Sequence, residues 1–287
     1  MSTVVNIVIY GVIMGGVYGL IAMGLTLQYG VGKILNVSHG EFLMLSAMTS
    51  CTLVKAGLHP LLSFLICLPA AFIIGFIINI TIYRYLRKVS KDEATFESNA
   101  MLMSFGLYFI LANIGLKIWG TLSKSYQYYS YPVKILGATI AVNRLIILAI
   151  AIIFIVAFFI FLNKTRIGKS IRATSQSTTA AAMMGVKINR TMAICFGTGG
   201  LLAAAAGVLI GMALSPTAQV GLSNTVIALI VVVLGGMGSI PGAVLGGLLI
   251  GLVGQAVSFI DSSLVMVANY LMVLILLLLR PKGLLGR

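Results

Sequence analysis

Charged residues are scarce in this chain, and acidic residues are the scarcest. Only 8% of the 287 residues are charged, with 5 Asp and Glu against 19 Lys and Arg. Soluble domains carry about 25% charged residues, so the composition excludes a fold whose main solvent is water. The 60% hydrophobic content is instead typical of a chain embedded in a bilayer.

Histidine and cysteine are also few, with 2 His and 3 Cys. Three of the five acids fall together in one loop, within 92–97, so no Ser/His/Asp set or metal cluster can be assembled. The cysteines lie singly in apolar runs, without metal-ligand spacing or a disulfide framework: Cys51, Cys67 and Cys195. The sequence therefore predicts no enzyme, and no metal or cofactor bound by this chain.

The net charge of +14 raises the question of nucleic acid. Nearly all the cations stand at the ends of apolar runs, where they set topology. No basic cluster is interleaved with aromatic residues as a single-strand groove requires. We therefore expect no nucleic-acid partner.

One short motif resembles the end of a nucleotide-binding P-loop, Gly168-Lys169-Ser170. The earlier glycine of that motif is missing, because Asn163 stands at its position. An apolar run rather than a strand precedes the motif. We therefore expect that the chain does not hydrolyse ATP by itself.

Long apolar runs predict an all-α, polytopic membrane protein that forms a single domain over residues 1–287. The runs lack the period-two alternation of a membrane β-barrel. The first run has no basic n-region and no cleavage site, so we expect a retained span. Segments 40–54 and 225–236 are short of the ~20 residues that a crossing needs. They are short crossings or broken, re-entrant helices, so eight or nine crossings both fit. The predicted membrane segments are 5–29, 40–54, 61–83, 100–118, 145–163, 191–214, 225–236, 242–259 and 264–280.

The distribution of Lys and Arg predicts the orientation. Segment 164–190 carries six cations and no acid, which places it on the cytoplasmic side by the positive-inside bias. Lys33, the loop 84–98 and the tail 280–287 fall on the same side, which then holds 14 of the 19 cations. The Tyr-rich loop 123–144 falls outside, as an interfacial belt or as a docking surface for an external partner. Nine crossings would place the N-terminus outside and the C-terminus inside.

Glycines repeat at four-residue spacing within several apolar runs. In lipid, such small residues let helix backbones approach closely. The pattern predicts a tightly packed bundle. The repeats are Gly11, Gly15 and Gly19 in the first run, then Gly207/Gly211, Gly242/Gly246 and Gly247/Gly251.

A polar break at 29–41 separates the first two apolar runs and contains Asn36, Ser38, His39 and Glu41. Glu41 is the only acidic residue before position 92. Irregular backbone at membrane depth survives only where protein buries it or where it lines a wet cavity. Two interpretations stay open: a solvated turn at the interface, or buried groups that line a substrate pathway.

A glycine-rich break at 234–246 separates two later runs. Its candidate pathway residues are Gly235, Gly236, Gly238 and Ser239, and Pro241 follows them. The glycines and proline favour a structural role, ending one helix and starting another at close range. We expect this break to pack on another helix near the permeation path. A plain cytoplasmic turn is the alternative.

Four segments carry a resemblance that covers essentially the whole chain. Segments 24–30, 36–41 and 234–242 resemble hallmarks of the LivH/LivM-type permeases, and 185–190 lies where that family has its ATPase-docking segment. The Asn-x-x-His-Gly-Glu signature at 36–41 is more similar to the LivH half.

The resemblance implies the membrane-spanning permease subunit of an ABC importer for branched-chain amino acids, in the bacterial cytoplasmic (inner) membrane. The implied partners are a second, LivM-like permease subunit, two ATPase subunits that bind ATP, and an external solute-binding protein. Related permeases carry urea, amides or other small solutes. An ion-coupled secondary transporter stays a rival within transport. An integral-membrane enzyme, a different class, would need a catalytic set that is missing here.

The resemblance also gives segment 164–190 a role as a cytoplasmic coupling segment. Importer permeases dock their ATPase through a Glu-Ala-Ala-x-x-x-Gly helix, and here a threonine replaces the acid. We expect a helix over 170–184 that lies in a groove of the ATPase and stops at a glycine. An amphipathic helix resting on lipid headgroups is the alternative. The predicted coupling residues are Arg172, Thr179, Ala180, Ala181, Met184 and Gly185.

Overall fold

The helices of this chain follow its apolar runs. A computed structural model describes residues 2–126, 128–129, 131–135 and 138–286. Parts of the Tyr-rich loop and Arg287 of the basic tail lie outside these described residues. The elements in chain order are α1 (Ser2–Gly32), α2 (His39–Lys55), α3 (Pro60–Ile78), a π-helical turn η1 (Asn79–Tyr83), α4 (Arg84–Val89), α5 (Glu93–Trp119), β1 (Pro132–Ile135), β2 (Ala138–Ala141), α6 (Val142–Lys164), α7 (Arg166–Gln176), α8 (Thr178–Met183), α9 (Ile188–Ala213), α10 (Val220–Gly235), α11 (Ile240–Ser258), a 3₁₀ turn η2 (Ser262–Leu264) and α12 (Val265–Leu279).

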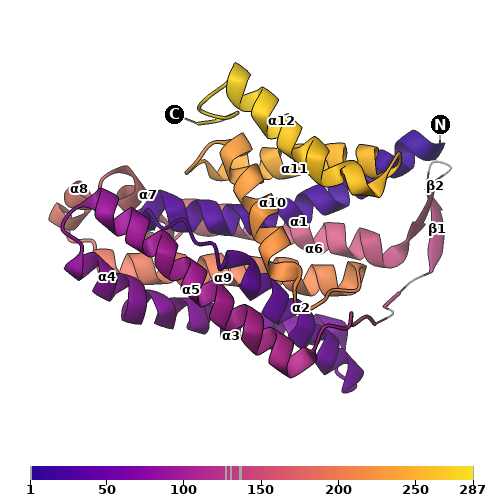
Figure 1. The fold of residues 1–287 in the computed structure, drawn as a ribbon, viewed down its shortest axis with the longest axis horizontal. Coiled ribbons are helices and arrows are strands. Elements are labelled where there is room, and N and C mark those ends of the chain that lie inside the picture. The colour runs from indigo at the N-terminus through magenta and orange to yellow at the C-terminus, as the bar shows by residue number, and fades with distance from the viewer. Residues whose placement is uncertain (1, 127, 130, 136–137, 287) are drawn as a thin grey trace.

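All nine predicted membrane segments are helical, which confirms the all-α, polytopic fold. Among the described residues, seven helices are long and apolar enough to cross a membrane. The two short segments are α2, of 17 residues, and α10, of 16. At 1.5 Å per residue they rise only about 24–26 Å, less than the ~30 Å hydrocarbon core. In Figure 1 both run obliquely to the long helices α1 and α9.

Helix α9 lies at the centre of the bundle. It packs against α3, α2 and α1, and its alanines from Ala203 to Ala206 are fully buried. Gly207 lies so close to the Leu43 carbonyl of α2 that a Cβ there would overlap it. The small residues of α9 therefore let α2 lie directly against it.

The glycine repeats of α1 and α11 form a second close crossing. A Cβ at Gly11 would lie 2.9 Å from the Leu252 Cα, and one at Gly15 would lie 2.8 Å from the Leu248 Cα. Residues further along α1 contact residues earlier in α11, so the two helices are antiparallel. The prediction of a tight bundle from glycine spacing is confirmed here.

The two ends of the bundle differ in charge. Figure 1 shows α4, α7, α8 and the C-terminus toward one end, and the N-terminus with the β1–β2 hairpin at the other. The first end collects the cations of α4 and α7, as the positive-inside pattern predicts. The opposite placement of the two termini agrees with an odd number of crossings.

Two local features differ from the sequence prediction. The outer loop contains an antiparallel hairpin, with Pro132 opposite Ala141 and Ile135 opposite Ala138. The single helix expected over 170–184 is wrong, because the chain forms α7 and α8 with a break at Ser177. The Ser177 side chain accepts a hydrogen bond from the Ala180 amide at 3.2 Å and so caps α8 at its N-terminus.

Candidate functional site

The polar break between α1 and α2 is buried in the protein. Asn36, Ser38 and His39 are fully buried, and Glu41 is only 1% exposed. The interpretation of this break as a solvated turn is therefore wrong. The backbone from Lys33 to Asn36 has no regular structure and Val37 and Ser38 form a turn. The polar groups that are buried here need partners within the protein.

A hydrogen-bond network supplies those partners from three helices. The Asn36 side chain donates to Gln28 Oε1 of α1 at 3.1 Å, and Gln28 Nε2 donates to the Phe196 carbonyl of α9 at 3.2 Å. The Val37 amide donates to Ser104 Oγ of α5 at 3.1 Å. Ser38 donates both its amide and its hydroxyl to Asn36 Oδ1. The break is thus fixed to α1, α5 and α9.

His39 binds α1 across the same region. Its Nε2 lies 3.0 Å from the Ile21 carbonyl, an arrangement that requires the ring proton on Nε2. A Cβ at Gly24 would lie 3.0 Å from His39 Cε1 and 2.7 Å from the Gly199 carbonyl. Gly24 therefore makes room for the histidine ring between α1 and α9, and His39 has a positioning role.

Helices α2 and α10 cross at two facing glycines. The Gly40 amide donates to Thr225 Oγ1 at 2.8 Å, and Thr225 Oγ1 donates to the Gly221 carbonyl at 3.2 Å. A Cβ on Gly40 would overlap the Gly221 carbonyl oxygen, and a Cβ on Gly221 would overlap Oε1 of Glu41. This close approach brings the Glu41 carboxylate against the backbone of α10.

Glu41 lines a cavity of about 550 Å³ between α2, α5, α10 and the start of α12. Polar groups come from Asn113, Gln219 and Ser223, while most of the remaining lining is aromatic or aliphatic. This size and mixture are typical of small-molecule sites, in which few polar groups orient a largely apolar ligand.

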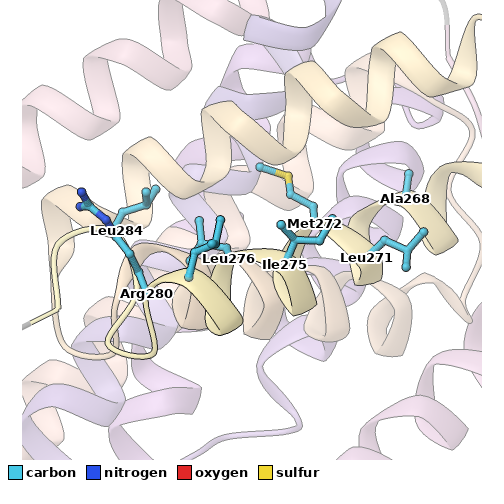
Figure 2. A pocket seen from close by; sticks show the side chains of 8 residues that line it. Ala268, Leu271, Met272, Ile275, Leu276, Arg280 and Leu284 are labelled. Carbon is cyan, nitrogen blue, oxygen red and sulfur yellow. The ribbon is translucent and has the colours of Figure 1, made fainter.

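A second cavity, of about 560 Å³, lies along α12 and the tail that follows it. Figure 2 shows Leu271, Met272, Ile275 and Leu276 following one another along the helix, with Arg280 toward one end. Its lining contains no acid and no amide side chain. Apart from Arg280 it is lined by apolar side chains, so it suits an apolar chain.

The glycine-rich break joins α10 to α11 at the opposite end of α10 from Glu41. From Gly221 to Gly235 the helix rises by about 21 Å, so the structure does not bring Gly235, Gly236, Gly238 and Ser239 to the Glu41 cavity. Their role in a pathway stays a prediction.

The close packing expected at this break is present. The neighbours are the start of α11 and the C-terminal tail, whereas the sequence predicted one other helix. A Cβ at Gly235 would overlap Gly242 across the break, and Gly236, at φ +100°, lies against the backbone of Gly286. The C-terminal tail donates from the Leu284 and Leu285 amides to carbonyls at the end of α10, at 2.9 and 3.0 Å. The tail thus satisfies two of the free carbonyls of that helix end, those of Leu234 and Gly235.

The coupling segment forms a separate surface at the basic end. Gly185 adopts φ +81° and ends α8, with the Gly185 and Val186 amides donating to Ala182 and Ala181. This is the glycine stop that the sequence predicts. Arg172 donates to Asn163 at 2.9 Å, which fixes α7 to the end of α6. Thr179, Ala180, Met184 and Gly185 are exposed, whereas Ala181 is buried against the bundle.

Several residues of the site were not singled out from the sequence. They are polar or small residues inside apolar runs, which is the one signal that could have found them. Their partners depend on tertiary contacts between distant helices. They are Gln28, Ser104, Asn113, Gly221, Ser223 and Thr225.

The fold and the site together define a multi-pass helical transport protein with a buried polar break beside a cavity that is open to the surface. A family described as "Branched-chain amino acid transport system / permease component" matches residues 7–280. The chain belongs to this family and is a membrane transport permease.

Curated relatives agree with this assignment. The chain is 30% identical to the high-affinity branched-chain amino acid transport system permease protein LivH of Salmonella typhimurium, over 96% of this chain and 94% of that protein. It is 32% identical to the permease protein BraD of Pseudomonas aeruginosa, with the same coverage of both. Among solved structures, PsaBC from Streptococcus pneumoniae in complex with Fab gives a TM-score of 0.52 at 13% identity, over 95% of this chain and 91% of that chain. That last likeness concerns the fold alone.

Proposed function

We propose that this chain is the permease subunit of an ABC importer that carries branched-chain amino acids across the cytoplasmic membrane of a bacterium. The observation that carries the proposal is the Glu41 cavity, which combines apolar walls with few polar groups. Such a cavity suits a zwitterion with an aliphatic side chain. The names of the LivH and BraD relatives support the same solute class.

The proposal includes three kinds of partner. Two ATPase subunits supply the ATP hydrolysis. The exposed Met183 at the end of α8 and Met184 directly after it give them an apolar surface at the basic end. A second permease subunit closes the transport path against exposed apolar side chains of α5, among them Leu102 and Phe109. An external binding protein delivers the solute to the end that carries the hairpin.

A buried acid in a membrane also fits an ion-coupled secondary transporter. Glu41 is such an acid, so this alternative is tested beside the importer. An ion-coupled transporter moves its solute as the isolated chain in liposomes, whereas an ABC permease requires its ATPase.

Two experiments test the proposed function. Purification of the tagged chain from its native membrane is expected to retain two soluble ATPase subunits and a second permease. Calorimetric titration of the cognate binding protein is expected to detect leucine, isoleucine and valine but neither urea nor amides. A binding protein specific for urea or amides would contradict the solute class, and loss of both partners would contradict the importer.

A further inference from the structure

The Glu41 carboxylate is buried without a partner of its own. Glu41 stands in the first turn of α2 and is 1% exposed. Within the part of the chain that the structure describes, no group donates a hydrogen bond to its Oε2 atom. A buried acceptor without a donor costs about 1–3 kcal/mol, and more when it is charged. The first turn of a helix favours a negative charge, but within the described residues no donor pairs with Oε2 to offset this cost.

The helix crossing explains why the carboxylate stays in this position. Gly221 of α10 has no side chain, and a Cβ there would lie 2.7 Å from Oε2 and overlap Oε1. The Gly40–Thr225 hydrogen bond fixes the adjacent residue of α2 at 2.8 Å from α10. The carboxylate thus lies against the backbone of α10, and Glu41 forms part of the wall of the cavity. This is the geometry of a preorganised acceptor.

The cavity offers complementary groups for the rest of a zwitterion. Asn113, Gln219 and Ser223 present amide and hydroxyl groups that can donate to a ligand carboxylate. Phe109, Leu116 and Val226 provide apolar surface for an aliphatic side chain. The missing component is a cation for Glu41, and an α-ammonium group supplies one with three hydrogen-bond donors.

We propose that Glu41 binds the ammonium group of the transported amino acid in the cavity between α2, α5, α10 and α12. The proposal rests on the proposed function, since it assumes that the solute is an amino acid. It adds a specificity: the site admits solutes with a free ammonium group and rejects deaminated acids, urea and amides.

The test uses the whole transporter, with both permeases, the ATPases and the binding protein, in proteoliposomes. Radiolabelled L-leucine uptake is measured together with ATP hydrolysis for wild type, Glu41→Gln, Glu41→Asp and the control Asp261→Asn. Asp261 is an exposed acid before α12 whose Oδ1 accepts from the Ser263 amide at 2.9 Å. The Asp261→Asn variant therefore removes an acidic side chain that does not line the cavity.

Loss of one charge-assisted hydrogen bond predicts a fall in leucine uptake by Glu41→Gln of about 10- to 100-fold. ATP hydrolysis stimulated by the loaded binding protein is expected to persist, because docking is intact. Glu41→Asp keeps the charge and is expected to retain part of the uptake, and Asp261→Asn all of it.

Leucine uptake by Glu41→Gln at the wild-type rate would overturn the proposal while leaving the permease function standing. Failure of both Glu41 variants to assemble with their partners would overturn it too, by giving Glu41 a structural role. A wild-type complex that imports no amino acid would overturn the proposed function, and the ammonium site with it.

Discussion

The crossing of α2 and α10 at Gly40 predicts a large effect for the smallest possible substitution. In Gly40→Ala the new methyl group would overlap the Gly221 carbonyl oxygen and Thr225 Oγ1, and would lie 2.9 Å from the Gly221 carbonyl carbon. Carbon atoms pack best at about 3.5–4.0 Å, so the two helices must separate by roughly 1 Å. That movement breaks the 2.8 Å hydrogen bond from the Gly40 amide to Thr225.

The cost follows from these two effects. Overpacking costs about 1–3 kcal/mol, and the lost hydrogen bond adds about 1 kcal/mol. Gly106→Ala on α5 is the matched control, because no atom lies within 4 Å of the position of its Cβ. There the substitution is expected to gain up to about 1 kcal/mol from helix propensity.

Thermal unfolding of the purified variants in detergent measures the difference. The melting temperature of Gly40→Ala is expected to lie below that of Gly106→Ala by roughly 5–15 °C. Equal melting temperatures for the two variants would refute the close crossing of α2 and α10, and with it the position of Glu41 against the backbone of α10.

Three further predictions concern the other glycines and the polar network. Gly185→Arg is expected to abolish transport and weaken ATPase association without loss of membrane insertion. The control Gly57→Arg, also at positive φ in open space, is expected to retain transport and ATPase association. Pull-down of the ATPase compares the two variants, and equal losses would mean that backbone strain, not docking, causes the effect. Gly236→Ala is expected to lower the melting temperature although alanine is small, because Gly236 has φ +100° and a Cβ there would meet the Gly286 backbone. An unchanged melting temperature would contradict the packing of the C-terminal tail on α10. Asn36→Ala is expected to destabilise the fold by about 1–3 kcal/mol, since it leaves buried partners unpaired; a melting curve that matches wild type would contradict the network.

The membrane segments were predictable because hydropathy depends on the local sequence alone. The boundaries were less so where a helix leaves the lipid. Helix α5 begins at Glu93, seven residues before the predicted segment 100–118, because its polar first turns extend beyond the apolar run. Helix α10 begins at Val220 rather than 225, since Gly221 and Asn224 face protein and not lipid.

The site was predictable only in part. Asn36, Ser38, His39 and Glu41 stand out as polar residues between apolar runs, and the structure keeps them together because they are neighbours in sequence. The glycine-rich break also stands out between two apolar runs, but it lies at the other end of α10 from Glu41. Partners such as Gln28 and Thr225 could not be inferred, because their contacts join helices far apart in the chain.

Under the proposed function, this permease moves an amino acid only when partner ATPases drive it. The most direct measurement is L-leucine uptake into proteoliposomes, compared between the complete complex with ATP and the isolated chain with an imposed proton or sodium gradient. We expect accumulation with the complex and ATP, and none with the isolated chain. Gradient-driven accumulation by the isolated chain would contradict the importer function and identify a secondary transporter.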